Sequence, residues 1–102
     1  MSRDIRWSRR AADRLEEAAL YFESARDDAG MRFLEDVQET LERVAFAPMA
    51  CPGIPGEPET TRRAVLPRFG YWIVYEVESD AIVVLTLWSA VRKPSSWKSD
   101  ID

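Results

Sequence analysis

The spacing of hydrophobic and polar residues changes several times along the chain, and each change predicts a different element. Ile5 and Trp7 alternate with Asp4 and Arg6, and this period of two predicts a short strand. Ser8 follows as a good helix N-cap residue. Small and apolar residues then recur at spacings of three and four, which predicts an amphipathic helix with a narrow apolar stripe. The stripe consists of Ala11, Ala12, Leu15, Ala18, Ala19 and Phe22.

A second helix is predicted directly after the first. Residues 27–30, Asp-Asp-Ala-Gly, supply turn chemistry and a cap. The apolar stripe then resumes and continues until Pro48. Its members are Phe33, Leu34, Val37, Leu41 and Val44. Two amphipathic helices with a short join predict an antiparallel helical hairpin.

The second half of the chain predicts strands. Residues 48–58 hold four of the six prolines and two of the four glycines, so this segment is expected to be an irregular surface connection. Residues 61–66 and 69–77 are predicted to be strands that turn at Pro67-Arg68, and 78–80 leads to a last strand over 81–88. The last strand is apolar on both faces, which favours a central position in the sheet.

These elements predict an α+β fold in a single domain over residues 1–102. The order β-α-α-β-β-β gives a small sheet of about four strands, mainly antiparallel, with the helical hairpin packed on one face. The hairpin is expected to contact the sheet through Leu15, Phe22, Phe33, Val37 and Leu41. The far face is expected to be a shallow groove with Tyr75 or Trp72 along its floor, covered only by the tail around Trp97. The expected rim of this groove is cationic and consists of Arg62, Arg63, Arg68, Arg92 and Lys93.

Composition narrows the range of functions. No apolar run approaches the roughly 20 residues of a membrane span, and the charged start of the chain does not resemble a signal peptide, so a cytoplasmic location is expected. There is no histidine and Cys51 is the only cysteine, so neither a metal site nor a cofactor is expected. The net charge is −4, which argues against tight nonspecific binding to duplex nucleic acid. Residues 1–60 carry thirteen acidic against eight basic residues, whereas residues 61–102 carry five against six.

The arginines of the C-terminal half are the candidate functional residues. A guanidinium group stays charged at cellular pH and offers several planar donors to phosphate or carboxylate. The five cations of the expected rim are therefore candidates for binding a target. Taken alone, Arg62 and Arg63 could equally be charged residues that protect an edge strand from aggregation. For Trp97 the structural interpretation, a lid over apolar area, is favoured.

Several segments together resemble the RelE/ParE superfamily of toxins from bacterial type II toxin–antitoxin systems, closer to ParE than to RelE. They are Ile5-Arg6-Trp7-Ser8 with Ala12 and Leu15, the pair Arg62-Arg63, the strand from Phe69 to Val77, and Arg92-Lys93-Pro94-Ser95-Ser96-Trp97. The chain departs from the family pattern at three positions. Gly70 and Trp72 replace a proline and an arginine of a frequent family motif, and Ser89 stands where the family often has histidine.

The resemblance implies two mechanisms. ParE-like toxins bind and poison DNA gyrase, whereas RelE-like toxins are ribosome-dependent endoribonucleases that need a base, an acid and cations around the phosphate. Weak candidates for catalysis are Arg62, Arg92 and Tyr75, and a carboxylate such as Glu57 or Glu59 would need a large pKa shift. No side chain has an ordinary pKa near neutrality, which favours a protein that binds its target over an enzyme.

Three hypotheses therefore stay open. The chain is a gyrase-binding toxin of a module that stabilises a plasmid or chromosome, an mRNA endoribonuclease, or a non-toxic homologue that serves as a binding module. In each case the resemblance implies a cognate antitoxin that neutralises the chain, and the host target is DNA gyrase or the ribosome with its mRNA. No membrane partner is expected, and the assembly could be a homodimer or a toxin–antitoxin hetero-oligomer.

Overall fold

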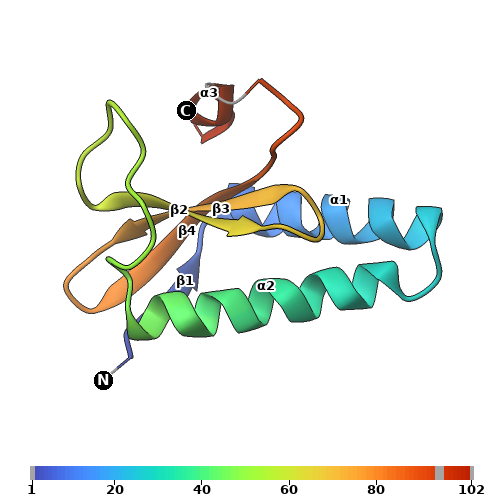
Figure 1. Ribbon diagram of the computed structural model, residues 1–102, viewed down its shortest axis with the longest axis horizontal. Coiled ribbons are helices and arrows are strands. Elements are labelled where there is room, and N and C mark those ends of the chain that lie inside the picture. Colours follow the sequence, from blue (N-terminus) through green and yellow to red (C-terminus); the bar gives the residue numbers. More distant parts are fainter. Residues whose placement is uncertain (1, 94–95, 102) are drawn as a thin grey trace.

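Two long helices and a four-stranded sheet make up most of the protein. The computed structural model describes residues 2–93 and 96–101. Its first six elements follow the order expected from the sequence, and a short terminal helix, which was not expected, comes after them. The elements are β1 (Asp4–Trp7), α1 (Arg9–Ala25), α2 (Ala29–Phe46), β2 (Thr61–Leu66), β3 (Tyr71–Val77), β4 (Ala81–Ser89) and α3 (Trp97–Ile101). Figure 1 shows α1 and α2 running antiparallel along the sheet.

The sheet is mixed, with the strand order β1-β4-β3-β2. β3 pairs antiparallel with both β2 and β4, whereas β1 pairs parallel with β4. β4 is therefore an inner strand, as its apolar sequence predicts. A bulge between Val74 and Tyr75 shifts the register of the β3–β4 ladder. The prediction of a mainly antiparallel sheet of about four strands in an α+β fold is confirmed.

The helix boundaries follow local chemistry. Ser8 caps α1, because its hydroxyl accepts a hydrogen bond from the Ala11 amide at 3.0 Å. The two helices join through Asp28, whose φ of 67° lies in the left-handed region. Gly30 lets the helices approach closely, since a Cβ there would lie 2.6 Å from the Ala19 carbonyl oxygen.

The main core lies between the helical hairpin and one face of the sheet. Phe33, Val37 and Leu41 of α2 are at most 3% exposed and pack against the sheet. Leu15 and Phe22 of α1 join them as partly buried members. The sheet contributes Ala64, Leu66, Ile73, Tyr75, Ile82, Val84 and Leu87. All five helix residues expected at the sheet belong to this core or pack against it.

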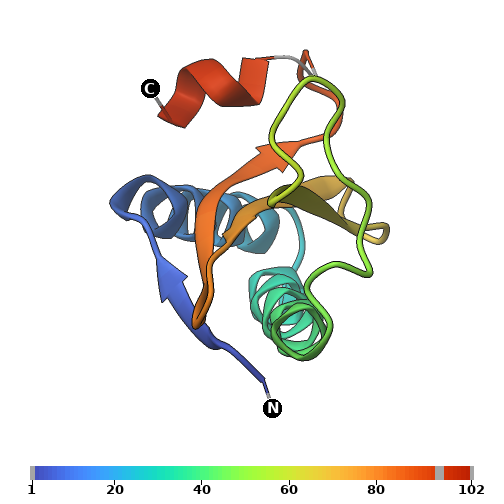
Figure 2. The ribbon, with the colours of Figure 1, turned by 90° about the vertical axis from the view of Figure 1, so that its left-hand side faces the viewer.

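The opposite face of the sheet is covered, and here the expectation of an open groove is wrong. A second apolar cluster forms there from Val74, Trp88 and Trp97, with Ile54 and Trp72 packed against it. Figure 1 shows α3 on the side of the sheet opposite α2, and Figure 2 shows the 47–60 connection rising beside it. The prediction for Trp97 as a lid is confirmed, because it is 5% exposed. Among the described residues, the helices are too short or too polar to cross a bilayer.

Candidate functional site

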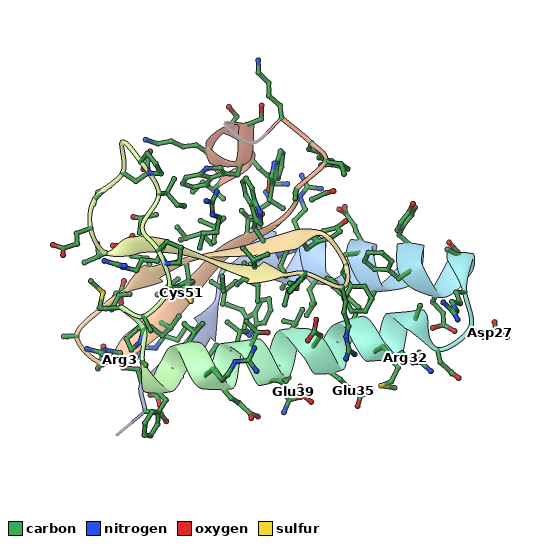
Figure 3. All side chains as sticks on the ribbon, in the orientation of Figure 1. Arg3, Asp27, Arg32, Glu35, Glu39 and Cys51 are labelled. Atoms are coloured by element: carbon green, nitrogen blue, oxygen red, sulfur yellow. The ribbon has the colours of Figure 1, made fainter. Side chains whose placement is uncertain are left out.

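Arg62 holds the irregular connection against the sheet. Its side chain extends from β2 toward this connection and donates hydrogen bonds to the backbone carbonyls of Glu59 at 3.0 Å, Met49 at 3.3 Å and Cys51. Gly53 also forms an isolated bridge with Arg62. Figure 3 shows Cys51 on the connection, beside the sheet. Most of the donor capacity of this guanidinium is therefore directed at backbone oxygens of its own chain.

Tyr75 is a core residue with a structural hydrogen bond. Its side chain is fully buried on the helix face of the sheet, and its hydroxyl donates to the Pro48 carbonyl at 2.8 Å. The expectation that Tyr75 lines the far face is therefore wrong, whereas Trp72 does lie there. Burial raises the pKa of Tyr75, so its hydroxyl stays protonated at neutral pH and a role as a base is disfavoured.

Arg63 lies on the opposite face from Arg62, because adjacent residues of a strand point to opposite sides. Its guanidinium carbon sits 4.3 Å from the centroid of the Trp72 ring, a cation–π contact. Its Nε is buried and has no hydrogen-bond partner among the described residues. A cavity of about 270 Å³ opens beside it. Ile54, Pro55, Glu57, Arg63, Trp72, Trp97 and Lys98 line this cavity.

Arg92 stacks on the neighbouring tryptophan. Its guanidinium carbon lies 5.2 Å from the centroid of the Trp88 ring, and Trp88 is the cross-strand partner of Trp72. The structure therefore brings Arg63 and Arg92 to two adjacent rings, but it separates Arg62 from them. The expectation that all three arginines converge is wrong, since the strand alternation turns Arg62 toward the helix face.

A groove in the surface runs beside Arg92. It has a volume of about 490 Å³ and lies between α1 and the end of the β3–β4 ladder. Its lining includes Arg14, Ala18, Tyr21, Phe22, Phe69, Tyr71, Leu87, Ser89, Val91 and Arg92. Phe22 packs edge-on against Phe69 and Tyr71, with ring centroids 5.0 and 5.7 Å away. We call this hollow the Arg92 groove.

The rim of the Arg92 groove combines apolar and charged groups. Tyr21 is 64% exposed and Val91 92% exposed, so both present apolar area to a partner. Arg92 is exposed and forms no ion pair with the described residues. Burial raises the pKa of Tyr71, which keeps its phenol neutral. Ser89, at the position where the resemblance leads to an expected histidine, contributes a hydroxyl to the lining.

The other two predicted cations, Arg68 and Lys93, are exposed. Arg68 follows Pro67 in the turn between β2 and β3, and Lys93 comes after Arg92 on the chain that leads to α3. The Lys93 carbonyl accepts a hydrogen bond from the Trp88 indole at 3.3 Å, so this part of the tail lies close to the sheet. The structure shows where these side chains lie, and their role in target binding stays a prediction.

Sequence reasoning missed the residues that fasten α3. Arg14 of α1 donates from Nε to both carboxylate oxygens of Asp100 at 3.1 Å, and Thr86 donates to the same carboxylate at 2.8 Å. These hydrogen bonds, that from Arg14 foremost, hold the pKa of Asp100 below its usual range. Lys98 adds an ion pair with Glu57 at 3.0 Å. No motif in the sequence marks these pairs, because their partners are more than ten residues apart.

The chemistry available to these sites is recognition of anions and aromatic or apolar groups. Among the described residues, no group of three or more potential metal ligands of the His, Cys, Asp or Glu type comes together. Two of the three weak catalytic candidates, Arg62 and Tyr75, are engaged with backbone carbonyls. Arg92 alone among the three lines the Arg92 groove.

Comparison with known proteins identifies a family that this chain matches over most of its length. The model of the ParE toxin of the type II toxin–antitoxin system parDE matches residues 5–94. A protein of Sinorhizobium fredii (strain NBRC 101917 / NGR234), Y4kP, which is named as a candidate toxin, is 35% identical over 86 residues. That alignment covers 84% of this chain and 86% of Y4kP.

Solved structures show the same fold at low sequence identity. A chain of the chromosomal ParDE system from P. aeruginosa superposes with a TM-score of 0.72 at 18% identity, over 86% of this chain and 96% of that one. A mutant of the E. coli toxin RelE in the free state gives a TM-score of 0.68 at 18% identity, over 99% and 95%. The extended family match and the shared architecture agree with the order of elements and residues read from the sequence. The chain belongs to the ParE toxin family, within the RelE/ParE superfamily of type II toxin–antitoxin systems.

Proposed function

We propose that this toxin inhibits growth in the cytoplasm by binding a host protein, DNA gyrase, in a module that stabilises a plasmid or chromosome and contains a neutralising antitoxin. The observation that carries the proposal is the Arg92 groove. It combines an aromatic floor, exposed apolar area at Tyr21 and Val91, and a guanidinium with no ion-pair partner among the described residues. Aromatic and arginine side chains around a pocket are typical of the energetic centres of protein interfaces.

The state of the weak catalytic candidates also supports binding over cleavage. Tyr75 is buried, its pKa is raised by burial, and its hydroxyl is hydrogen-bonded to Pro48. Ser89 replaces the histidine that the family often has, and a serine hydroxyl does not titrate near neutral pH. The chain therefore offers cations for a phosphate, whereas neither Tyr75 nor Ser89 is suited to exchange a proton with RNA at neutral pH.

Inhibition of gyrase tests this proposal directly. Purified toxin is added to a supercoiling assay with purified gyrase, and Arg92→Glu is compared with Arg32→Glu. Arg32 is the matched control, since it lies exposed on α2, away from the Arg92 groove (Figure 3). Loss of a central anchor costs about 2 kcal/mol, so the Arg92 variant should need roughly 30-fold more protein for the same inhibition. Unchanged supercoiling at saturating toxin would refute the gyrase target.

The adjacent cation–π pairs favour a second candidate function, cleavage of mRNA on the ribosome. Arg63 lies over Trp72 and Arg92 lies over Trp88, and these two tryptophans are paired across the adjacent strands β3 and β4. Bases stack on aromatic rings, and guanidinium groups bind phosphates. Cleavage of a defined mRNA on programmed ribosomes would establish this alternative. A chain that neither inhibits gyrase nor cleaves mRNA, and does not slow growth when expressed, would be a non-toxic binding homologue.

A further inference from the structure

The two arginines that line the Arg92 groove differ in what they already bind. Arg14 donates from Nε to the Asp100 carboxylate at 3.1 Å and from Nη1 to Glu17 at 2.7 Å, so its charge is compensated by two acids. Arg92 is exposed and forms no ion pair with the described residues. Within the described lining, Arg92 is therefore the arginine that remains available to a partner.

The guanidinium of Arg92 is held in a way that suits a carboxylate. Its central carbon lies 5.2 Å from the centroid of the Trp88 ring, and Trp88 is buried. Stacking on a ring engages a face of the guanidinium and leaves the N–H donors at its edge free. A carboxylate can accept two parallel hydrogen bonds from such an edge. Arg92 is thus prepared to bind one carboxylate.

The α1 side of the Arg92 groove limits how much negative charge a partner can bring. Glu17 lines this side and shares Arg14 with Asp100, so one guanidinium serves two carboxylates and a net negative charge remains there. Like charges brought together at an interface repel each other. A nucleic-acid backbone, which carries a phosphate at every nucleotide, is therefore disfavoured. The groove suits a partner with a single negative charge at the Arg92 end.

The floor of the Arg92 groove favours an aromatic side chain. The ring of Phe22 lies edge-on to those of Phe69 and Tyr71, with centroids 5.0 and 5.7 Å away. Tyr21 and Val91 extend this apolar area to the rim, where they are largely exposed. A further ring can join such a cluster edge-to-face or offset, and aromatic residues are frequent anchors of protein interfaces.

We propose that the Arg92 groove binds a segment of the target protein in which one acidic residue lies next to one aromatic residue. The carboxylate accepts hydrogen bonds from Arg92, and the aromatic ring packs against Phe22 and Phe69. The inference rests on the proposed function and specifies what the toxin recognises on gyrase. It assigns recognition to a protein segment of gyrase and not to the DNA that gyrase holds.

A short peptide with one glutamate beside one phenylalanine, among glycines and serines and with both ends capped, tests the proposal. It is titrated into ¹⁵N-labelled full-length toxin, and amide shifts are followed by NMR. The largest shifts are expected at Val91 and Arg92. A glutamine in place of the glutamate should weaken binding about tenfold, because the hydrogen bonds to Arg92 lose the negative partner. An alanine in place of the phenylalanine should weaken binding at least about tenfold.

Exchange of the charges tests the contact with Arg92. Arg92→Glu should lose the glutamate peptide and bind a peptide with lysine in its place, which a misfolded variant could not do. Arg32→Glu, exposed on α2 and outside the groove, should keep the original preference. An oligothymidylate should leave Val91 and Arg92 unshifted. No binding of the glutamate peptide, equal binding of the glutamine peptide, or larger shifts at Val91 and Arg92 with the oligothymidylate would each overturn the proposal.

The supercoiling assay distinguishes failure of this inference from failure of the proposed function. At saturating concentration the glutamate peptide should restore supercoiling in the presence of toxin, because it occupies the surface that gyrase needs. If the peptide does not bind while the toxin inhibits gyrase and Arg92→Glu relieves the inhibition, only the inference is wrong. If the peptide binds at Val91 and Arg92 but the toxin does not inhibit gyrase, only the target assignment is wrong.

Discussion

The Arg14–Asp100 pair should decide how firmly α3 covers the far face of the sheet. The Asp100 side chain is 5% exposed and Arg14 is 23% exposed, so water screens this pair only in part. Asp100→Asn removes the charge but keeps the size of the side chain. Arg14 retains Glu17, which lies at 2.7 Å, so its guanidinium is not left without a partner.

The size of the effect follows from these exposures. Removing one partner of a fully buried pair costs about 3–5 kcal/mol, and an exposed pair contributes about 0.2–1 kcal/mol. For a partly screened pair with one remaining partner, we expect a coupling energy of about 1.5 kcal/mol between Arg14 and Asp100. The opening of α3 should therefore become roughly tenfold more frequent in Asp100→Asn.

A double-mutant cycle measures this coupling. The free energy of α3 opening is obtained from amide hydrogen exchange of α3 in the unsubstituted chain, Arg14→Gln, Asp100→Asn and the double variant. The same cycle on Arg6 and Asp80 is the control, because that pair is 53% and 71% exposed and spans 3.4 Å. Its coupling should stay below about 0.5 kcal/mol. Equal coupling in the two cycles would show that the Arg14–Asp100 pair holds α3 no more strongly than an exposed ion pair would.

The same pair predicts a dependence on pH. The pKa of Asp100 is lower in the folded protein than in the unfolded chain, chiefly through the hydrogen bond from Arg14. The stabilisation is therefore complete above the unfolded value of about 3.9 and is lost as pH falls through the lower folded pKa. Protection of α3 should fall in this acidic range in the unsubstituted chain and stay flat in Asp100→Asn. A loss of protection between about pH 6 and 8 would contradict the assignment of this pH dependence to Asp100, because a carboxylate with a lowered pKa does not titrate near neutrality.

Three further changes test the packing. Gly30→Ala should lower the free energy of unfolding by about 2 kcal/mol in urea denaturation, because its Cβ would lie 2.6 Å from the Ala19 carbonyl, whereas Gly53→Ala, with open space around it, should be near neutral. Tyr75→Phe should lower the free energy of unfolding by about 1–2 kcal/mol, because it leaves the Pro48 carbonyl unpaired, and should leave gyrase inhibition unchanged. If the chain cleaves RNA and this substitution abolishes the cleavage, Tyr75 is a catalytic residue after all. Arg62→Ala should speed limited proteolysis within residues 47–60, and an unchanged cleavage rate would show that the hydrogen bonds to Glu59, Met49 and Cys51 do not restrain this segment.

The placement of the arginines shows where reasoning from the sequence could have gone further. Arg62 and Arg63 are adjacent in a strand, so their opposite directions follow from the period of two and were available without coordinates. Which face each one reaches was not available, because it depends on the pairing of β2 with β3. Trp72 and Trp88 lie side by side and so bring Arg63 and Arg92 to adjacent rings. This placement also depends on the register of the β2–β3 and β3–β4 pairs.

The sequence by itself determined the order and type of the six main elements, the Ser8 cap, the inner position of β4 and the helix residues of the core. These features depend on local periodicity and capping, which act over a few residues. Only the tertiary structure decided that α3 and the 47–60 connection cover the far face of the sheet and that Arg62 donates hydrogen bonds to backbone carbonyls of its own chain. It also decided that β1 lies at an edge of the sheet, paired with β4 alone among the described strands. Each of these depends on contacts between segments far apart in sequence, such as Arg14 with Asp100, for which local periodicity carries no signal.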